Sequence, residues 1–164
     1  IDVTRKSVEE TAASILKILR TLHIRIKQHS YNAMYLAKKF EKLGLKTVYP
    51  GLTSHPSHLV FKNQMNTEFG YGGMLTIDVG SLKKANSLME LMQKKNLGYL
   101  AVSLGFYKTL FSAPGTSTSS EIPEDEQIKM GLSEGLIRFS VGLDNDIHRT
   151  FLSMTDCMNE VGIF

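Results

Sequence analysis

The residue best suited to chemistry is an arginine near the carboxyl end of the sequence. Arg138 lies in the run 136–142, where it alternates with Ile137, Phe139 and Val141. Alternation with a period of two is typical of a half-buried strand, and it turns Arg138 away from the apolar side. A guanidinium is a planar fork that holds a carboxylate through two parallel hydrogen bonds. The pattern therefore predicts either a carboxylate site or a salt bridge to one of the chain's own 16 acidic residues, and spacing alone favours the salt bridge.

Two hydroxyl-bearing stretches are weaker candidates for a binding site. Ser103 lies in the run Ala101–Gly105, at the exit of a predicted strand and just before a flexible glycine. The segment Thr116–Ser120 consists of five hydroxyl residues on a predicted loop. Such a loop can close over a ligand, but most loops of this composition are solvated connections.

The histidines, the cysteine and the glycines of the sequence do not form a recognisable catalytic or metal-binding motif. His55 and His58 have no carboxylate or thiolate neighbour, so we expect packing or helix capping there instead of a metal site. Cys157, the single cysteine, is expected to be an inert packing residue. The run Gly70–Gly73 precedes a predicted strand, whereas a phosphate-binding glycine loop precedes a helix.

Length and composition predict one compact domain. The chain has 164 residues, of which 42% are hydrophobic and 21% charged, and its formal net charge is +3. The charge is too small and too dispersed for a nucleic-acid or membrane surface, so we expect neither partner. One cysteine and the lack of a signal-like apolar segment favour the cytoplasm. Because the chain opens on Ile1 without an initiator methionine, we expect it to be a piece of a longer protein.

Periodicity predicts alternating helices and strands. Two helices, or one bent helix, are expected over residues 7–43, and a short loop with several hydroxyl groups is expected over 112–120. Further helices are expected at 56–65, at 81–94, after the 112–120 loop and from residue 147 onward. Strands are expected at 46–49, 72–79, 97–103 and 136–141.

These elements predict an α/β (α+β-like) fold in which helices cover a small sheet. Connections between the strands are too short for parallel crossovers throughout, so the sheet should be mainly antiparallel or mixed, with its helices on one face. We expect an N-terminal helical segment over residues 1–44 and a small α/β domain over 45–164.

Six stretches of the sequence, read together, carry a family resemblance. In chain order they are Leu19–His29, Tyr49–His58, Gln64–Met65, Gly70–Met74, Ala101–Gly105 and Gly135–Gly142. Their order and content resemble the carboxyl-terminal domain of the pyridoxal-phosphate (PLP) enzymes of cysteine and methionine metabolism, the transsulfuration family. Methionine gamma-lyase and the cystathionine enzymes belong to this group, and the chain is most similar in style to methionine gamma-lyase.

The resemblance implies a larger enzyme with a PLP domain ahead of this one. In such fold-type I enzymes the small domain closes the active site, and a lysine of the large domain in a Ser-x-x-Lys motif forms the Schiff base with PLP. None of this chain's lysines matches that motif. The resemblance therefore implies that the chain alone is inactive and that PLP binds the large domain.

The family's functional residues carry over to four positions. The arginine of its Leu-Ile-Arg-x-Ser pattern holds the substrate α-carboxylate and corresponds to Arg138, which reverses the preference for a salt bridge. The serine of its Ser-Leu-Gly pattern corresponds to Ser103, and a threonine of the following loop to Thr118. Val102 stands where cystathionine-specific members often carry glutamate, and Lys108 replaces a glutamate that is common in the family.

The implied substrate is a sulfur amino acid of the methionine, homocysteine or O-acyl-homoserine class, because an apolar residue at Val102 suits these better than a substrate with a distal amino group. The implied reaction is γ-elimination by a carbon–sulfur lyase, in a homo-oligomer whose small and large domains pack together. Two other functions stay open at this point. The chain could be a stand-alone amino-acid-binding module that retains the fold without chemistry, or a module for oligomerisation only.

Overall fold

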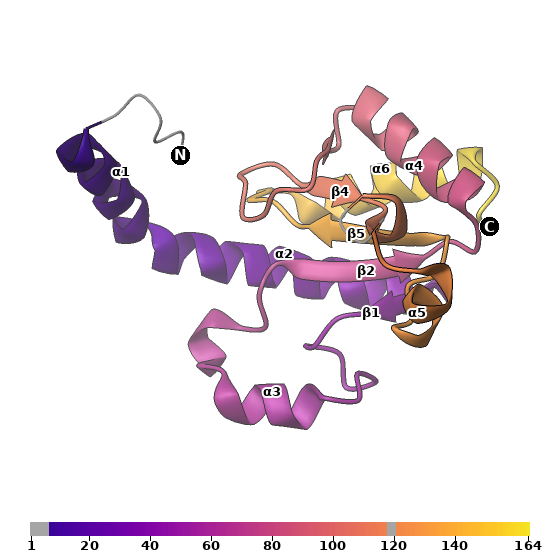
Figure 1. The fold of residues 1–164 in the computed structure, drawn as a ribbon, viewed down its shortest axis with the longest axis horizontal. Coiled ribbons are helices and arrows are strands. Elements are labelled where there is room, and N and C mark those ends of the chain that lie inside the picture. Colours follow the sequence, from indigo (N-terminus) through magenta and orange to yellow (C-terminus); the bar gives the residue numbers. More distant parts are fainter. Residues whose placement is uncertain (1–6, 118–120) are drawn as a thin grey trace.

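The computed structural model describes residues 7–117 and 121–164 of the chain (Figure 1). The α-helices in these ranges are α1 (Val8–Arg20), α2 (Leu22–Lys42), α3 (His58–Gln64), α4 (Leu82–Lys94), α5 (Glu124–Lys129) and α6 (Ile147–Glu160). The strands are β1 (Lys46–Val48), β2 (Met74–Asp78), β3 (Tyr99–Leu100), β4 (Leu110–Ser112) and β5 (Leu136–Ser140), and two 3-10 turns, η1 (Thr67–Phe69) and η2 (Pro114–Thr116), complete the elements. None of these helices is both long and apolar enough to cross a membrane.

The five strands form one mixed sheet in the order β1-β2-β5-β4-β3. The β1·β2, β2·β5 and β4·β5 pairs are antiparallel, whereas β3 runs parallel to β4. Strand β5, although last in the sequence, therefore occupies the centre of the sheet. The mixed sheet with its helices confirms the fold class predicted from the sequence.

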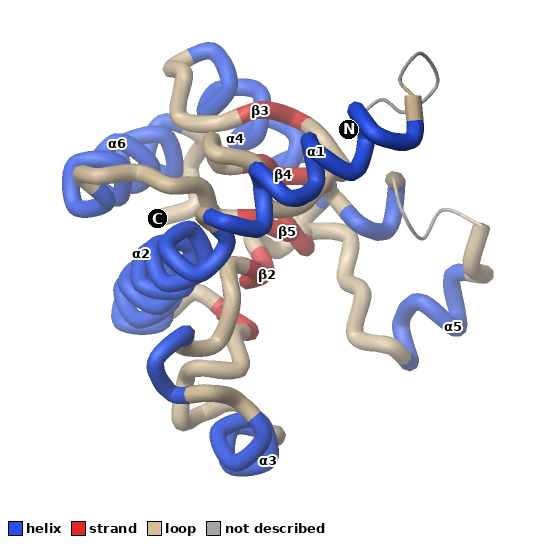
Figure 2. Tube along the Cα trace, turned by 90° about the vertical axis from the view of Figure 1, so that its left-hand side faces the viewer, coloured by secondary structure: helices blue, strands red, loops and turns tan. Residues whose placement is uncertain are grey.

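Helices α2, α4 and α6 pack together beside the sheet and bury its apolar face. Phe139 of β5 lies at the centre of the core, with its ring centroid 6.2 Å from that of Phe40 on α2 and 6.0 Å from that of Phe111 on β4. The Phe151 ring of α6 joins them, 5.9 Å from Phe40. Figure 2 shows α2 and α6 on one side of the strands and α5 on the other. The alternating apolar residues of β5 are buried because this layer of helices covers them.

The N-terminal helical segment consists of two helices that meet at Thr21. Ser7 caps α1 through a reciprocal pair of hydrogen bonds with Glu10: the Glu10 N–H donates to Ser7 Oγ at 3.2 Å, and the Ser7 N–H donates to Glu10 Oε2 at 2.9 Å. Helix α2 buries one stripe against the sheet, whereas no side chain of α1 is buried.

Two strands differ from the sequence-based prediction. The strand expected over residues 97–103 is only Tyr99–Leu100, because the chain leaves the sheet edge after Ala101, whose N–H donates to the Phe111 carbonyl at 3.1 Å. The sequence does not predict strand β4, and it places the last residue of that strand, Ser112, in a loop. All three residues of β4 are buried, so the strand lacks the polar–apolar alternation by which a half-buried strand is found.

A buried histidine joins α2 to the end of β5. The imidazole Nδ1 of His29 lies 2.6 Å from the Val141 carbonyl oxygen and must donate to it, because a carbonyl only accepts. Burial lowers the pKa of His29, while the hydrogen bond to Val141 opposes that shift and the nearby charge of Arg25 adds to it. The neutral imidazole is therefore the form that fits the folded domain.

Replacing Phe139 with alanine should destabilise the domain by about 3–5 kcal/mol, because it removes a fully buried ring at the centre of the core. Urea denaturation followed by circular dichroism measures the change. Tyr31→Ala is the matched control, since Tyr31 is 64% exposed on the outer side of α2 and should change stability little. Equal losses in the two variants would contradict the assigned core.

The folded domain should lose stability as the pH falls below 6.5. His29 has its ordinary pKa of 6.5 in the unfolded chain and a lower one in the folded chain, so below pH 6.5 the unfolded state takes up the proton first. The stabilisation is complete above this range and disappears as the pH approaches the lowered folded-state pKa. Urea denaturation at a series of pH values, with His29→Gln beside the parent chain, isolates the contribution of this residue. Parallel pH profiles for the two proteins would contradict the assignment.

Candidate functional site

Arg138 occupies the middle of the central strand, on the sheet face opposite the helical layer. Its directly paired neighbours are Thr76 on β2 and Ser112 on β4. Directly paired residues in an antiparallel sheet share a face, so the three side chains form one row across the sheet. The sequence prediction that Arg138 points away from the apolar core is confirmed by this register.

The segment that follows β3 is held against this row by hydrogen bonds. Arg138 Nη2 donates to the carbonyl oxygen of Val102 at 3.0 Å. The Gly105 N–H donates to the hydroxyl of Ser140 at 3.1 Å, on the same face of β5. Gly105 has a φ of +68°, a left-handed conformation that favours glycine. Two side chains of β5 thus fix the path of residues 102–105 over the sheet.

Polar atoms beside Val102 have unused hydrogen-bonding capacity. Arg138 Nε is buried and has no hydrogen-bond partner among the described residues, and the buried hydroxyl of Ser112 next to it has none either. A buried donor without an acceptor costs about 1–3 kcal/mol. These two groups are therefore placed to receive an acceptor such as a carboxylate oxygen.

A hollow of about 260 Å³ lies at this end of the sheet, between α4 and the ends of β3 and β4. Apolar side chains contribute much of its wall, and the polar lining residues are an asparagine and two serines. The lining residues are Asn86, Met89, Leu100, Ala101, Val102, Phe111, Ser112, Ala113 and Ser117. An apolar group of a few heavy atoms is the kind of ligand that such a hollow accepts.

The structure brings two of the four predicted site residues into contact. The main-chain carbonyl of Val102 contacts Arg138, and the residue as a whole is 55% exposed. Ser103 is next in sequence and exposed, without a hydrogen bond to another described residue. Thr118 lies outside the described residues. Sequence reasoning missed Ser112, because the alternation that would have marked it as a strand residue is absent from β4.

The salt bridge that spacing alone favoured for Arg138 is not among the ion pairs of the described residues. All of those pairs use a lysine as the cation, and most of their side chains are exposed. The guanidinium contacts a neutral carbonyl instead. Within the described part of the chain, the positive charge of Arg138 thus has no carboxylate partner.

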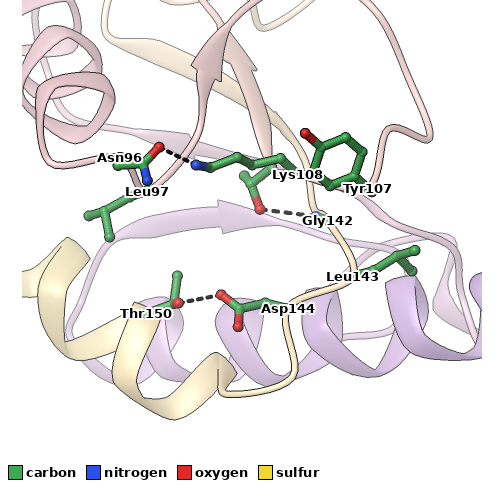
Figure 3. Close-up of a pocket in the computed structure, with 9 residues that line it drawn as sticks. Asn96, Leu97, Tyr107, Lys108, Gly142, Leu143, Asp144 and Thr150 are labelled. Atoms are coloured by element: carbon green, nitrogen blue, oxygen red, sulfur yellow. Dashed lines mark hydrogen bonds between the residues drawn. The ribbon is translucent and has the colours of Figure 1, made fainter.

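A second hollow, of about 220 Å³, lies between the chain at 107–109 and the start of α6 (Figure 3). Lys108 reaches Asn96 on one wall and Asp144 reaches Thr150 on the other, so both charged groups are engaged in structural contacts. The Gly142 N–H donates to Thr109 Oγ1 at 3.0 Å. A Cβ at position 142 would lie 2.5 Å from the Thr109 nitrogen, so the close approach of the two segments requires glycine.

The remaining candidates from the sequence have structural contacts. His58 Nδ1 donates to the Pro50 carbonyl at 2.9 Å, and the ring stacks on Tyr71 with 5.4 Å between centroids. His55 Nδ1 accepts from the Ser57 N–H at 3.1 Å. Burial raises the pKa of the Cys157 thiol, which disfavours the reactive thiolate. In residues 7–117 and 121–164 no three histidine, cysteine or acidic side chains gather in a way that could hold a metal ion.

Comparison with known proteins identifies the class and then the family. Structures of PLP-dependent enzymes of fold type I share this arrangement of sheet and helices. The family model "Cys/Met metabolism PLP-dependent enzyme" matches residues 7–149. The chain belongs to this family, as its sequence motifs predicted.

Curated relatives are sulfur-amino-acid lyases. The chain is 46% identical over 122 residues to the methionine gamma-lyase of Arabidopsis thaliana, an alignment that covers 74% of the chain and 28% of the relative. It is 39% identical over 133 residues to the cystathionine gamma-lyase of Dictyostelium discoideum, covering 79% of the chain and 33% of the relative. The chain thus spans about a third of the length of these relatives.

A solved structure also resembles this chain. An O-acetylhomoserine (thiol)-lyase of Campylobacter jejuni, whose structure contains a pyridoxyl-lysine phosphate, superposes with a TM-score of 0.79 at 29% identity. The match covers 88% of the chain and 34% of the solved protein. The fold described above therefore corresponds to one third of a PLP-containing protein.

Proposed function

We propose that this chain is the carboxyl-terminal, substrate-carboxylate-binding domain of a PLP-dependent carbon–sulfur lyase of the methionine gamma-lyase type, which acts by γ-elimination. The observation that carries the proposal is the state of Arg138. It lies on the sheet face opposite the helical layer, and among the described residues no acid pairs with it and its buried Nε has no acceptor. Membership of the Cys/Met metabolism family supplies the class of substrate.

The geometry suits the binding of a substrate α-carboxylate. The Val102 carbonyl accepts from one N–H of Nη2. An incoming carboxylate can then accept from Nε and the other N–H of Nη2, two donors that point the same way along one edge of the guanidinium. Ser112, beside Arg138, can donate to the same carboxylate. We assign assisting roles to Ser103 and Thr118 from the family resemblance. A substrate held in this way presents its reacting bonds in a fixed orientation.

We further propose that this chain does not form a PLP site of its own. A Schiff-base lysine needs a desolvated pocket that lowers its pKa, but no lysine of the described ranges is buried and none lines the hollow beside Arg138. The residues that line that hollow include no lysine or arginine that could hold a phosphate. We therefore assign PLP and its lysine to a large domain of the same enzyme, and we expect the chain alone to be inactive.

The exposed side chain of Val102 sets the expected preference among substrates. It stands beside the Arg138 anchor, where a substrate's distal end would pass, and it offers no charge to a distal amino group. Methionine, homocysteine and O-acyl-homoserine substrates suit such a surface better than cystathionine does. We further propose that the enzyme is a cytoplasmic homo-oligomer that contacts neither nucleic acid nor membrane, with residues 1–44 leading into the small domain.

Arg138→Ala should weaken substrate binding in an active enzyme. A chimera in which this chain replaces the matching segment of the Arabidopsis methionine gamma-lyase provides the assay. Loss of a charge-assisted pair should raise the KM for methionine by roughly tenfold to a hundredfold and lower kcat, while the visible absorbance of bound PLP persists. Arg138→Lys should recover little, because an ammonium cannot form the bidentate pair.

Arg149→Ala is the matched control for the arginine variant, since Arg149 is exposed on α6, away from the row on β5. It should leave KM and kcat unchanged. If the Arg138→Ala chimera kept the parent's kinetics, Arg138 would not belong to the site. If the chain bound methionine in calorimetric titration and showed no dependence on a PLP domain, a stand-alone binding module would replace the lyase domain as the assigned function.

Val102→Glu should shift the same chimera toward substrates with a distal amino group. A carboxylate beside the anchor attracts the second ammonium group of cystathionine, so the ratio of kcat/KM for cystathionine to that for methionine should rise by roughly tenfold. Leu104→Glu, 59% exposed on the same segment, is the control and should leave the ratio unchanged. Equal ratios for the parent chimera and the Val102→Glu variant would separate Val102 from substrate choice.

A further inference from the structure

The second hollow, between the chain at 107–109 and the start of α6, has a cation on one wall and a carboxylate on the other (Figure 3). The cation is Lys108 and the carboxylate is that of Asp144. Neither group forms an ion pair with the other or with any other residue that the structure describes. Two opposite charges thus lie on opposite walls of one hollow without neutralising each other.

Both charged groups keep hydrogen-bonding capacity beyond their structural contacts. An ammonium group has three N–H donors, and Lys108 uses one of them for the Asn96 side chain. A carboxylate has about four lone-pair sites, of which Asp144 uses one for the Thr150 hydroxyl and one for the Asp146 N–H at 2.9 Å. A ligand can therefore bind either group without displacing a contact of the folded domain.

A third polar group of the hollow has an unused donor. Thr109 is only 4% exposed, and its Oγ1 accepts from the Gly142 N–H at 3.0 Å. The hydrogen of the same hydroxyl has no acceptor among the described residues. Because a hydroxyl can donate and accept at once, Thr109 can donate to a ligand while it still accepts from Gly142.

Both walls of the hollow are held in place by the fold. The Leu143 N–H donates to the Tyr107 carbonyl at 2.7 Å, which joins the two sides of the hollow. Asn32 of α2 is fully buried, and its Nδ2 donates to the carbonyls of Gly142 at 2.9 Å and Asp144 at 2.8 Å. Because the walls are already ordered, a ligand would lose little binding free energy in ordering them.

Charge and size together define the class of ligand. A molecule with both a carboxylate and an ammonium group can satisfy Lys108 and Asp144 at once, whereas a simple anion or cation would leave one of them unpaired. Leu97 and Leu143 supply apolar lining, which suits a hydrocarbon side chain. The volume of about 220 Å³ lies below the roughly 300–1,000 Å³ of sites for drug-sized ligands, so the ligand is small.

We infer that the second hollow binds a free α-amino acid with an apolar side chain, its carboxylate beside Lys108 and its ammonium group beside Asp144. The inference does not rest on the proposed function, because none of the residues involved belongs to the site on β5. The hollow lies beyond the carboxyl end of β5, whereas Arg138 lies in the middle of that strand. It is therefore a second amino-acid site, separate from the one proposed at Arg138.

Isothermal titration calorimetry of the 164-residue chain with L-leucine tests the inference. Binding should be measurable, and it should persist in Arg138→Ala, which removes the other carboxylate anchor. Two analogues test whether the ligand bridges the walls: leucinamide lacks the carboxylate, and 4-methylpentanoate lacks the ammonium group. Each should bind roughly tenfold to a hundredfold more weakly than leucine, because each leaves one charged wall unpaired.

Two variants test the assigned partners. Lys108→Met removes the cation and keeps the length of the side chain, so it should weaken leucine binding by roughly tenfold to a hundredfold. Asp144→Asn removes the negative charge but keeps an oxygen for the Asp146 N–H, and it should weaken binding by a similar factor. Lys83→Met is the matched control, since Lys83 is exposed on α4 and does not line the hollow. Circular dichroism verifies that each variant is folded.

Three results would overturn the inference. If leucine did not bind the parent chain, the hollow would not be an amino-acid site. Binding that Arg138→Ala abolished and Lys108→Met left unchanged would place the ligand at the site on β5. If 4-methylpentanoate bound as tightly as leucine, the ammonium group would have no partner, and the bridging of Lys108 and Asp144 would be wrong.

Discussion

The antiparallel pairing of β5 between β2 and β4 determines which of its side chains enter the core and which lie on the opposite face of the sheet. Because successive residues of a strand point to opposite faces, this register places Phe139 under the helical layer and Arg138 on the other side of the sheet. A slip of one residue would bury the guanidinium and expose the phenyl ring. The hydrophobic packing of Phe139 on one face of the sheet thus fixes the position of Arg138 on the opposite face, although the two side chains do not touch.

The elements that sequence analysis predicted well are those in which local pattern and tertiary environment agree. Strands β2 and β5 are half-buried and alternate, and helices α4 and α6 carry one apolar stripe each behind a capping residue, Ser81 or Asp146. Strand β4 is short and buried on both faces, so its run of residues carries no period. The predicted strand at 97–103 ends early because Arg138 and Ser140, far away in sequence, draw the chain off the sheet edge.

In the candidate site, too, some features could be predicted from the sequence and others could not. The outward direction of Arg138 follows from the strand period alone, and its chemistry follows from the shape of a guanidinium. The contact between Arg138 and residue 102 could not be predicted from the sequence. The partner is a main-chain carbonyl 36 positions away, and a carbonyl is present in every residue type. The Ser112 hydroxyl, which has no hydrogen-bond partner among the described residues, is recognised as part of the site only from the pairing of β4 with β5. Contacts that depend on how the strands are arranged, and not on residue type, could not be predicted from the sequence.

The use of a main-chain carbonyl to hold Arg138 has an evolutionary consequence. A carbonyl oxygen is unaffected by the side chain on its own residue, so any replacement at position 102 that preserves the backbone leaves the arginine held as before. Under the proposed function, recognition of the carboxylate that all α-amino acids share would therefore be independent of the side chain at position 102. Under the same proposal, relatives built on this domain could change substrate preference through single substitutions at position 102 and still bind the carboxylate of an amino acid at every step.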